Sequence, residues 1–329
     1  MYFKKLKSFL AIFIVATFIM PQSIYAYSDY IIAGGENIGL QINNNGIIVA
    51  GFYKVDNEFI GKNANLNKGD VIKSVDNNKV SNIEEFVNAI KNSNGQYINL
   101  TYMRNNKENN TTLYLKSEDG VFKTGLYVKD MITGIGTLTY IDPKTKIYGA
   151  LGHEVIEASS GVMLDVKDGK IYNSTVTGID KSMRGDPGYK NALADSNDVF
   201  GAIKENTISG IFGNYTKKIN DNKLYKVAEY KDIKLGEAKI ITVINGYEKQ
   251  EYEIEILKVN NDEADNKNIL FEIKNEELIS KTGGIVQGMS GSPIIQGENI
   301  IGAVTNVVVN NPKKGYGILI TTMLKEGEN

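Results

Sequence analysis

The chain has 329 residues, of which 42% are hydrophobic, so it is long enough for about two domains with packed cores. Its net charge of −2 gives no indication of a nucleic-acid partner. The sequence has no cysteine and one histidine, which excludes disulfides and thiolate catalysis and argues against a structural zinc site. We therefore expect neither a metal ion nor another cofactor.

Residues 1–26 have the pattern of an export signal. Lys4, Lys5 and Lys7 precede an apolar run of twelve residues, 9–20, and residues 23–26 offer a small residue for cleavage. This run is short for a membrane span, which needs about 20 residues, and is typical of a signal-peptide core. An uncleaved anchor, lengthened by flanking residues, is the alternative. In both cases the rest of the chain is exported.

Residues 30–116 are expected to be β-rich with one clear helix. Ser81 and Glu84 form a capping box at the start of this helix. Apolar residues at positions i, i+3, i+4 and i+7 then form one helical face: Ile83, Phe86, Val87 and Ile90. Residues 69–80 indicate a strand, a turn and a strand, and residues 97–104 and 111–116 indicate a hairpin.

This arrangement resembles a PDZ domain, with residues 117–123 as the linker that follows it. Residues 38–42 resemble the carboxylate-binding loop and edge strand of such domains, which would assign peptide binding to Gly39, Leu40, Gln41 and Ile42. A peptide could add there as an extra strand. The ligand would be a protein with a free C-terminus or the chain's own N-terminal segment, and a purely structural groove is the alternative.

Residues 124–329 are expected to form an all-β domain. Strand-like segments recur between turn residues without a long amphipathic helix: 137–141, 170–177, 239–244, 251–259, 269–273, 300–309 and 316–322. Residues 252–256 alternate strictly between apolar and charged side chains, as a half-buried antiparallel strand does. This pattern predicts a barrel or a sandwich. No internal repeat is strong enough to indicate two barrels.

A glycine-rich segment, residues 283–295, carries two serines between β-branched runs. A tight turn there would expose a hydroxyl and let successive backbone N–H groups converge, which is what acyl transfer needs. Ser292 precedes Pro293 and fits a turn position better, so Ser290 is the candidate nucleophile. A glycine-rich hairpin with serines at turn positions is the structural alternative.

His153 is the only histidine and so the only candidate for a histidine base acting on Ser290. The order of histidine before serine matches the chymotrypsin-type arrangement and differs from that of the α/β-hydrolases. A structural histidine at a strand end and a Ser–Lys dyad remain open.

Several stretches together resemble the SpoIVB peptidases (stage IV sporulation protein B): residues 134–143, 148–153, 206–213 and 282–295. The resemblance extends from about Ile31 to the C-terminus. It implies a mainly β protein in which a PDZ-like domain precedes a chymotrypsin-like double β-barrel with the site between the barrels. It also implies a serine endopeptidase of spore formation, exported into the space between forespore and mother cell. Such an enzyme would cleave a membrane-associated sporulation protein and also itself.

The same resemblance assigns the oxyanion donors to the N–H groups of Gly288 and Ser290. The family has an aspartate fifteen residues before the serine, and that position here is Asn275. An amide can hold the tautomer of His153 but cannot stabilise the imidazolium by charge. We therefore expect Asn275 to orient a site of reduced activity.

Two alternatives to Asn275 stay open. Another acid could orient the histidine, the candidates being Glu276, Asp195 and Asp198. The domain could also have lost most catalysis, which would leave a PDZ-type binding or scaffolding protein. A general envelope quality-control protease is a third hypothesis, disfavoured because the PDZ-like module comes first.

Overall fold

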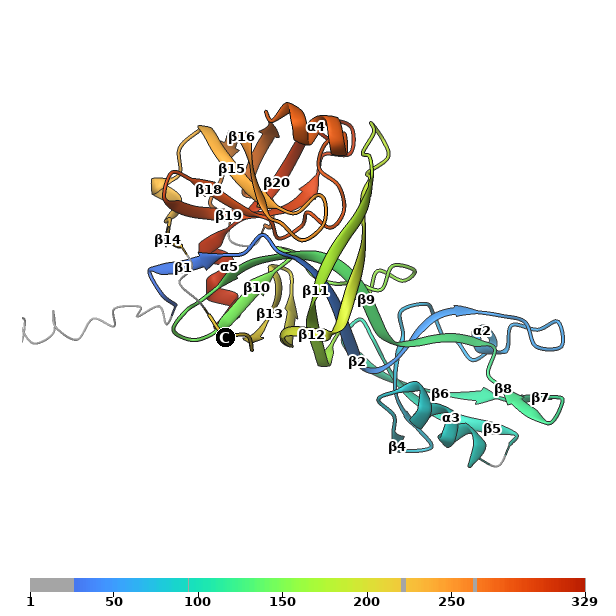
Figure 1. The fold of residues 1–329 in the computed structure, drawn as a ribbon. Coiled ribbons are helices and arrows are strands. Elements are labelled where there is room, and N and C mark those ends of the chain that lie inside the picture. The colour runs from blue at the N-terminus through green and yellow to red at the C-terminus, as the bar shows by residue number, and fades with distance from the viewer. Residues whose placement is uncertain (1–26, 94, 220–222, 263–264, 329) are drawn as a thin grey trace, which may run out of the picture.

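The computed structural model describes residues 27–93, 95–219, 223–262 and 265–328. They form two packed β-barrels and a smaller N-terminal module at one end of the molecule (Figure 1). The expected signal peptide or anchor, residues 1–26, lies outside the described residues. Within the described part of the chain, no helix is both long and apolar enough to cross a membrane.

Six antiparallel strands close the first barrel in the order β9, β2, β11, β12, β13, β10 and back to β9. Their bounds are β2 (Asn37–Phe52), β9 (Leu126–Ile141), β10 (Ile147–Ala150), β11 (Val166–Asp180), β12 (Tyr189–Thr207) and β13 (Gly210–Tyr215). Branched side chains such as Ile38, Leu40 and Ile171 fill its interior. Closure leaves these strands few free edges.

The second barrel has the same plan, in the order β15, β16, β17, β20, β19, β18 and back to β15. Its strands are β15 (Gly236–Thr242), β16 (Gln250–Val259), β17 (Ile269–Ile273), β18 (Pro293–Gln296), β19 (Asn299–Val307) and β20 (Lys314–Leu319). The predicted alternation in β16 is confirmed, because Tyr252, Ile254 and Ile256 are buried in this core. The expectation of a mainly β double barrel is therefore correct.

A separate apolar core joins the two barrels. It involves β1 (Tyr30–Ala33), β14 (Leu224–Val227), which pairs with both β1 and β19, and α5 (Ile320–Gly327). A short 3₁₀ helix, η1 (Tyr230–Asp232), follows β14. The strand predicted over 316–322 ends at Leu319, and the remaining residues begin α5, whose apolar side packs between the barrels.

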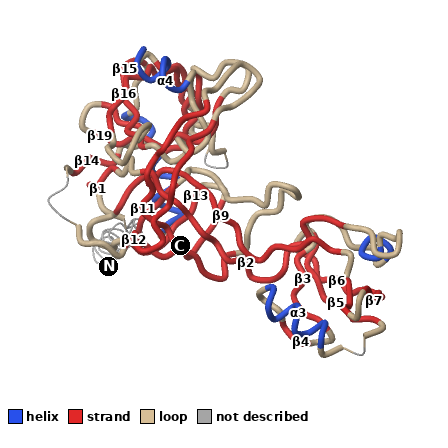
Figure 2. Tube along the Cα trace, turned by 45° about the vertical axis from the view of Figure 1, so that its right-hand side comes forward, coloured by secondary structure: helices blue, strands red, loops and turns tan. Residues whose placement is uncertain are grey.

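The N-terminal module has its own core, shared with the second half of β2 and the start of β9. Its elements are α2 (Ile60–Asn63), β3 (Val71–Val75), β4 (Asn78–Lys79), α3 (Ile83–Lys91), β5 (Tyr97–Arg104) and β6 (Lys107–Tyr114). The predicted linker is instead a hairpin of β7 (Lys116–Glu118) and β8 (Val121–Lys123). Figure 2 shows β2 and β9 running from barrel to module. The predicted unit 30–116 needs revision, because β1 and the first half of β2 pair with barrel strands.

Helix α3 confirms the predicted helix but corrects its cap. The N-cap is Asn82, whose side-chain oxygen accepts the N–H of Glu85 at 2.8 Å. The Glu85 carboxylate in turn accepts the N–H and hydroxyl of Ser81 at 2.7 and 3.0 Å. The sequence offers two overlapping cap and acid pairs, one residue apart, and the helix uses the second.

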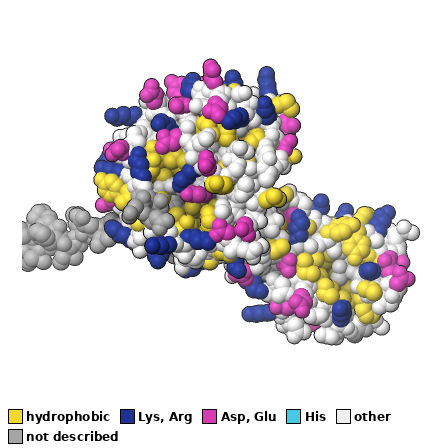
Figure 3. Space-filling model, viewed as in Figure 1, with side chains coloured by type: hydrophobic (Ala, Val, Ile, Leu, Met, Phe, Trp, Pro, Cys, Tyr) yellow, Lys and Arg dark blue, Asp and Glu magenta, His cyan; other side chains and the backbone are white. Residues whose placement is uncertain are grey.

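On the face drawn in Figure 3, basic and acidic side chains are interspersed over both parts of the molecule.

Candidate active site

Ser290 lies on the turn between α4 (Glu276–Thr282) and β18. Gly288 and Gly291 on either side of it both have a φ of +93°, which only glycine adopts readily. A Cβ on Gly291 would lie 2.1 Å from the carbonyl oxygen of Thr137 in β9. Glycine therefore lets the turn of the second barrel pack directly against the first barrel. The Ser290 hydroxyl donates to the carbonyl of Thr305 in β19 at 2.8 Å.

The two amides predicted as oxyanion donors are unpaired. The N–H groups of Gly288 and Ser290 form no hydrogen bond with any described residue, whereas the N–H of Met289 between them donates to Val286 at 3.1 Å. Both residues line the cavity described below. An oxyanion hole requires donors left free for the developing negative charge, and this turn provides two.

His153 follows β10 after two residues with left-handed backbone, Leu151 and Gly152, whose φ values are +71° and +72°. Its Nδ1 lies 2.8 Å from the carbonyl oxygen of Glu154. A carbonyl only accepts hydrogen bonds, so Nδ1 carries a proton, and in the neutral imidazole Nε2 then has the lone pair. This is the tautomer that a general base acting on serine needs.

Ser290 and His153 line one cavity of about 760 Å³. A Cβ on Gly152, next to His153, would lie 2.9 Å from Cγ2 of Thr305, the residue whose carbonyl binds the Ser290 hydroxyl. The histidine turn and the serine turn thus meet at Thr305. The structure brings the predicted nucleophile and base into the same cleft between the barrels, although the serine hydroxyl is bound to Thr305 rather than to the imidazole.

Asn275 does not contact His153, so the predicted orienting contact is wrong for this structure. Asn275 is the N-cap of α4, where its side-chain oxygen accepts the N–H of Leu278 at 2.9 Å. Its amide nitrogen donates to the Glu253 carboxylate at 2.5 Å. Its oxygen is thus used in capping α4 and its nitrogen in binding Glu253, and the carbonyl of Glu154 takes the place expected for the asparagine.

The three alternative acids do not reach the histidine either. The Asp198 carboxylate pairs with Lys217 and accepts from Asn173 at 2.9 Å. Asp195 accepts the N–H of Asn197 at 2.9 Å, and Glu276 is exposed in the first turn of α4. Among the described residues, no carboxylate bonds to the imidazole.

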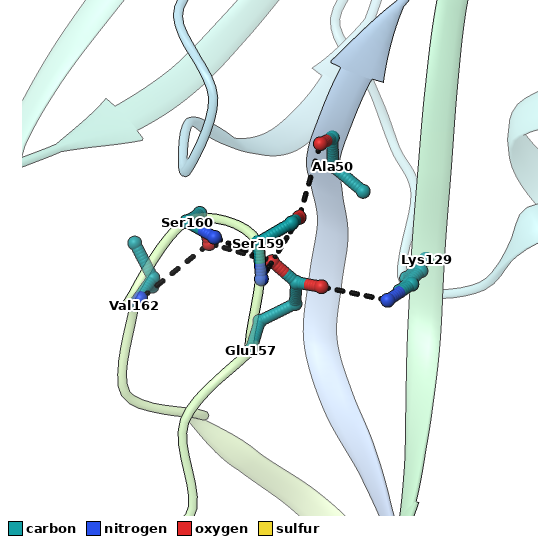
Figure 4. A network of polar contacts seen from close by, with 6 residues as sticks. All are labelled: Ala50, Lys129, Glu157, Ser159, Ser160 and Val162. Carbon is teal, nitrogen blue, oxygen red and sulfur yellow. Dashed lines mark hydrogen bonds and ion pairs between the residues drawn. The ribbon is translucent and has the colours of Figure 1, made fainter. Parts of the chain in front are cut away.

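The loop after His153 is anchored by Glu157, whose side chain is fully buried (Figure 4). Its carboxylate accepts from Lys129 at 2.6 Å and from the hydroxyls of Ser159 and Ser160 at 2.6 and 2.9 Å. Burial alone would raise the pKa of Glu157, but these hydrogen bonds outweigh it and lower the pKa to about 2. The network fixes the loop against β9, and the Ser159 hydroxyl lies 3.0 Å from the carbonyl of Ala50 in β2.

Asn206 at the end of β12 holds the same loop from the other side. Its side chain accepts the N–H of Val155 at 2.7 Å and donates to the carbonyls of Val155 and Leu164 at 2.9 and 3.0 Å. Sequence reasoning missed this role, although Asn206 begins one of the stretches that resemble the peptidase family. Glu157 gave no comparable signal, because a lone glutamate next to two serines is a common loop pattern.

The peptide-binding prediction for Gly39, Leu40, Gln41 and Ile42 is wrong. These residues lie in the middle of the first barrel, where β2 pairs with β9 along one side and with β11 along the other. A ligand strand needs an open edge, and both edges of this segment are occupied. The side chain of Leu40 lines the cavity of Ser290 and His153 instead.

Two lysines bear on the Ser–Lys alternative. Lys129 lines the cavity, but its ammonium pairs with Glu157. Lys190 is buried beneath the serine turn, where its ammonium donates to Thr242 at 3.1 Å and to Asn37 at 3.3 Å. Burial lowers the pKa of Lys190 to about 7. Lys190 does not line the cavity, and the ammonium of Lys129 is paired, whereas His153 lines the cavity with no hydrogen bond at Nε2 among the described residues. The geometry therefore favours His153 as the base.

Comparisons with known proteins agree with this architecture. A family model described as SpoIVB peptidase S55 matches residues 120–324, and a PDZ domain model matches residues 37–115. The search of curated proteins gave no match.

Solved structures similar to parts of the chain include a PDZ domain and a protease. The PDZ domain of the SdrC-like protein (Lmo2051) from Listeria monocytogenes is 22% identical over 27% of this chain and 93% of that one, with a TM-score of 0.23. The active form of the Rv3671c protease from M. tuberculosis is 12% identical over 58% of this chain and 71% of that one, with a TM-score of 0.31. An inactive form of Rv3671c is 13% identical over 57% and 80%, with a TM-score of 0.30.

The peptidase model extends from β8 into α5, more than half of the chain, and covers every strand of the two barrels except β2. It includes the turns that carry His153 and Ser290. The chain therefore belongs to the SpoIVB peptidase S55 family of serine peptidases and carries a PDZ domain ahead of its catalytic barrels.

Proposed function

We propose that this chain is an exported serine endopeptidase of spore formation. Its substrate would be a membrane-associated sporulation protein in the space between forespore and mother cell, together with its own N-terminal segment. Family membership and the signal-like pattern of residues 1–26 support this assignment. The observation that carries the enzymatic part is that Ser290 and His153 line one cavity beside two unpaired amides.

In the proposed mechanism, Ser290 attacks the carbonyl carbon of the scissile peptide bond while Nε2 of His153 accepts the hydroxyl proton. The N–H groups of Gly288 and Ser290 bind the oxyanion. The imidazolium then protonates the leaving amine, and water releases the acyl group by the same steps in reverse. The Ser290 hydroxyl must first leave the carbonyl of Thr305, which rotation of its side chain allows.

The proposed enzyme is slow, because the group behind the imidazole is neutral. The carbonyl of Glu154 orients Nδ1 but cannot offset the positive charge on His153. In a full triad, replacing the acid by an amide costs about 10⁴-fold in turnover through the wrong histidine tautomer, so this factor is an upper limit where the Glu154 carbonyl holds the right one. We expect detectable but reduced cleavage. The asparagine at the position of the family aspartate led to the same expectation from the sequence.

Self-processing of the full-length chain tests this proposal. We expect mass spectrometry to find the wild type cleaved near its N-terminus and Ser290→Ala intact. Ser292→Ala is the matched control, because Ser292 lies two positions away, is fully buried and does not line the cavity. It should be processed as the wild type is. The same fragments from the wild type and Ser290→Ala would refute serine catalysis.

A PDZ-type binding or scaffolding protein with a weakened peptidase domain is the second candidate. It is favoured by the lack of a carboxylate contact to His153 among the described residues. Peptide binding without any cleavage by the wild type would support it. Its ligand would have to bind away from residues 39–42, because both edges of that segment are paired.

A further inference from the structure

Thr137 in β9 contacts the serine turn at two points, although it belongs to the other barrel. Its hydroxyl donates to the carbonyl of Gly288 at 2.8 Å, and its N–H donates to the carbonyl of Ser290 at 2.9 Å. Its own carbonyl accepts the N–H of Leu151, close to His153, at 3.3 Å. The Thr137 side chain is completely buried. One residue of the first barrel is therefore bonded to both of the turns that form the site.

The hydroxyl contact falls on the peptide unit between the two oxyanion donors. This unit consists of the Gly288 carbonyl and the Met289 N–H, and it is held at both ends. Thr137 binds its oxygen, and the carbonyl of Val286 binds its N–H at 3.1 Å. Rotation of this unit would change the relative direction of the flanking N–H groups of Gly288 and Ser290. Because the two hydrogen bonds fix this peptide unit, the N–H groups of Gly288 and Ser290 both stay available to one oxyanion.

The backbone of the turn does not hold this geometry unaided. Gly288 has a φ of +93° and no side chain, so its conformational range is wide. On its other side, the stem of Lys190 packs closely, because a Cβ at Gly288 would lie 3.1 Å from Cδ of that lysine. Lys190 fills space beside the glycine, whereas the Thr137 hydroxyl is the group that fixes the direction of its carbonyl.

We propose that Thr137 is a positioning residue for acyl transfer, whose hydroxyl orients the Gly288–Met289 peptide unit so that the amides of Gly288 and Ser290 act together as the oxyanion hole. This inference rests on the proposed serine peptidase function. Thr137 touches neither the substrate nor the reacting atoms, and it acts through the turn. Its removal should slow the covalent step and leave reversible binding unchanged, because oxyanion contacts strengthen in the transition state.

A fluorophosphonate probe, which phosphonylates an activated serine with loss of fluoride, tests the proposal without knowledge of the substrate. Saturation kinetics separate its reversible binding constant from the rate of the covalent step. Thr137→Val has nearly the shape of threonine without the hydroxyl, and Thr137→Ser keeps the hydroxyl. Thr282→Val is the control, because Thr282, the last residue of α4, is equally buried. Its hydroxyl lies 2.8 and 2.6 Å from the carbonyls of Leu278 and Gly284 and has no hydrogen bond to the Gly288–Met289 peptide unit.

We expect Thr137→Val to lose on the order of 10- to 100-fold in the covalent rate, less than the full loss of an oxyanion donor. Thr137→Ser and Thr282→Val should stay within about threefold of the wild type. If Thr137→Val does not fold, Thr137→Ala replaces it, and the same contrast with Thr137→Ser is required.

Wild-type labelling at Ser290 with an equal rate in Thr137→Val would overturn the inference and leave the peptidase proposal standing. An equal loss in Thr137→Ser or in Thr282→Val would also overturn it, because packing would then explain the effect. If wild type and Ser290→Ala label alike, the proposed function fails and the inference fails with it.

Discussion

Replacing Glu157 by glutamine should loosen the loop that follows His153. The buried carboxylate accepts hydrogen bonds from Lys129, Ser159 and Ser160, and the network ties residues 157–160 to β9 and β2 (Figure 4). Glutamine has nearly the same shape, but it carries no charge and turns one acceptor into a donor. The substitution therefore tests the charge and the hydrogen bonds without opening a large cavity.

The pKa of Glu157 sets a ceiling for the effect on stability. Hydrogen bonds overcome the opposing effect of burial and lower this pKa from 4.5 to about 2, a difference of about 2.5, or about 3 kcal/mol at about 1.36 kcal/mol per unit. Because 45% of the Lys129 side chain is exposed, solvent screens its share. We expect Glu157→Gln to lower the free energy of unfolding by about 1–2 kcal/mol at pH 7.

The pH dependence gives the sharper test. The folded state holds this carboxylate ionised more strongly than the unfolded state does, so its contribution is fully present above about pH 4.5. It is lost as the pH falls through about 2. The difference between wild type and Glu157→Gln in urea denaturation should therefore shrink as the pH is lowered through this window.

Glu118→Gln, in the exposed hairpin of β7 and β8, is the control and should be neutral at every pH. A Glu157→Gln variant as stable as the wild type at pH 7 would refute the reasoning. A difference that does not change between pH 5 and pH 3 would refute it as well.

Two further predictions follow from buried or capping groups. Asn275→Asp should leave cleavage within about twofold and lower the free energy of unfolding by less than about 1 kcal/mol, because the new carboxylate faces Glu253; a tenfold gain in cleavage would instead restore this position to the triad. For Lys190, burial lowers the pKa from 10.5 to about 7, so the unfolded state binds more protons between these values. The stability of the wild type relative to Lys190→Met should therefore rise between pH 7 and pH 10, with a ceiling of about 5 kcal/mol, and a constant difference in urea denaturation would contradict the burial of this lysine.

Local signals in the sequence predicted most elements and singled out two candidate catalytic residues, which the structure places in one cavity. Alternation of apolar and charged side chains gave β16, and a capping pattern with an apolar face gave α3, to within one residue of its cap. The glycine turn and the single histidine pointed to Ser290 and His153 because few residue types can supply a nucleophile and its base. Each of these inferences depended on neighbours within a few positions along the chain.

The partners of those residues could not be predicted in the same way. The spacing from Ser290 suggested Asn275, but spacing does not say that the side chain would be used to cap α4. The role of the Glu154 carbonyl in orienting His153 could not be predicted from the sequence either, because every residue has a backbone carbonyl. Residues 38–42 look like an edge strand locally, and only the pairing with β9 and β11 makes them central.

The sequence by itself therefore determined that this protein is a β-rich serine peptidase of known family with a PDZ domain ahead of it. The tertiary structure alone decided which groups orient His153, which amides remain unpaired and which strand edges are closed. The physical reason is that hydrogen bonds between strands and across the barrel interface join residues more than a hundred positions apart, as Thr137 and Gly288 do. Such contacts depend on the strand register in which the barrels close, and patterns of neighbouring residues in the sequence do not predict this register.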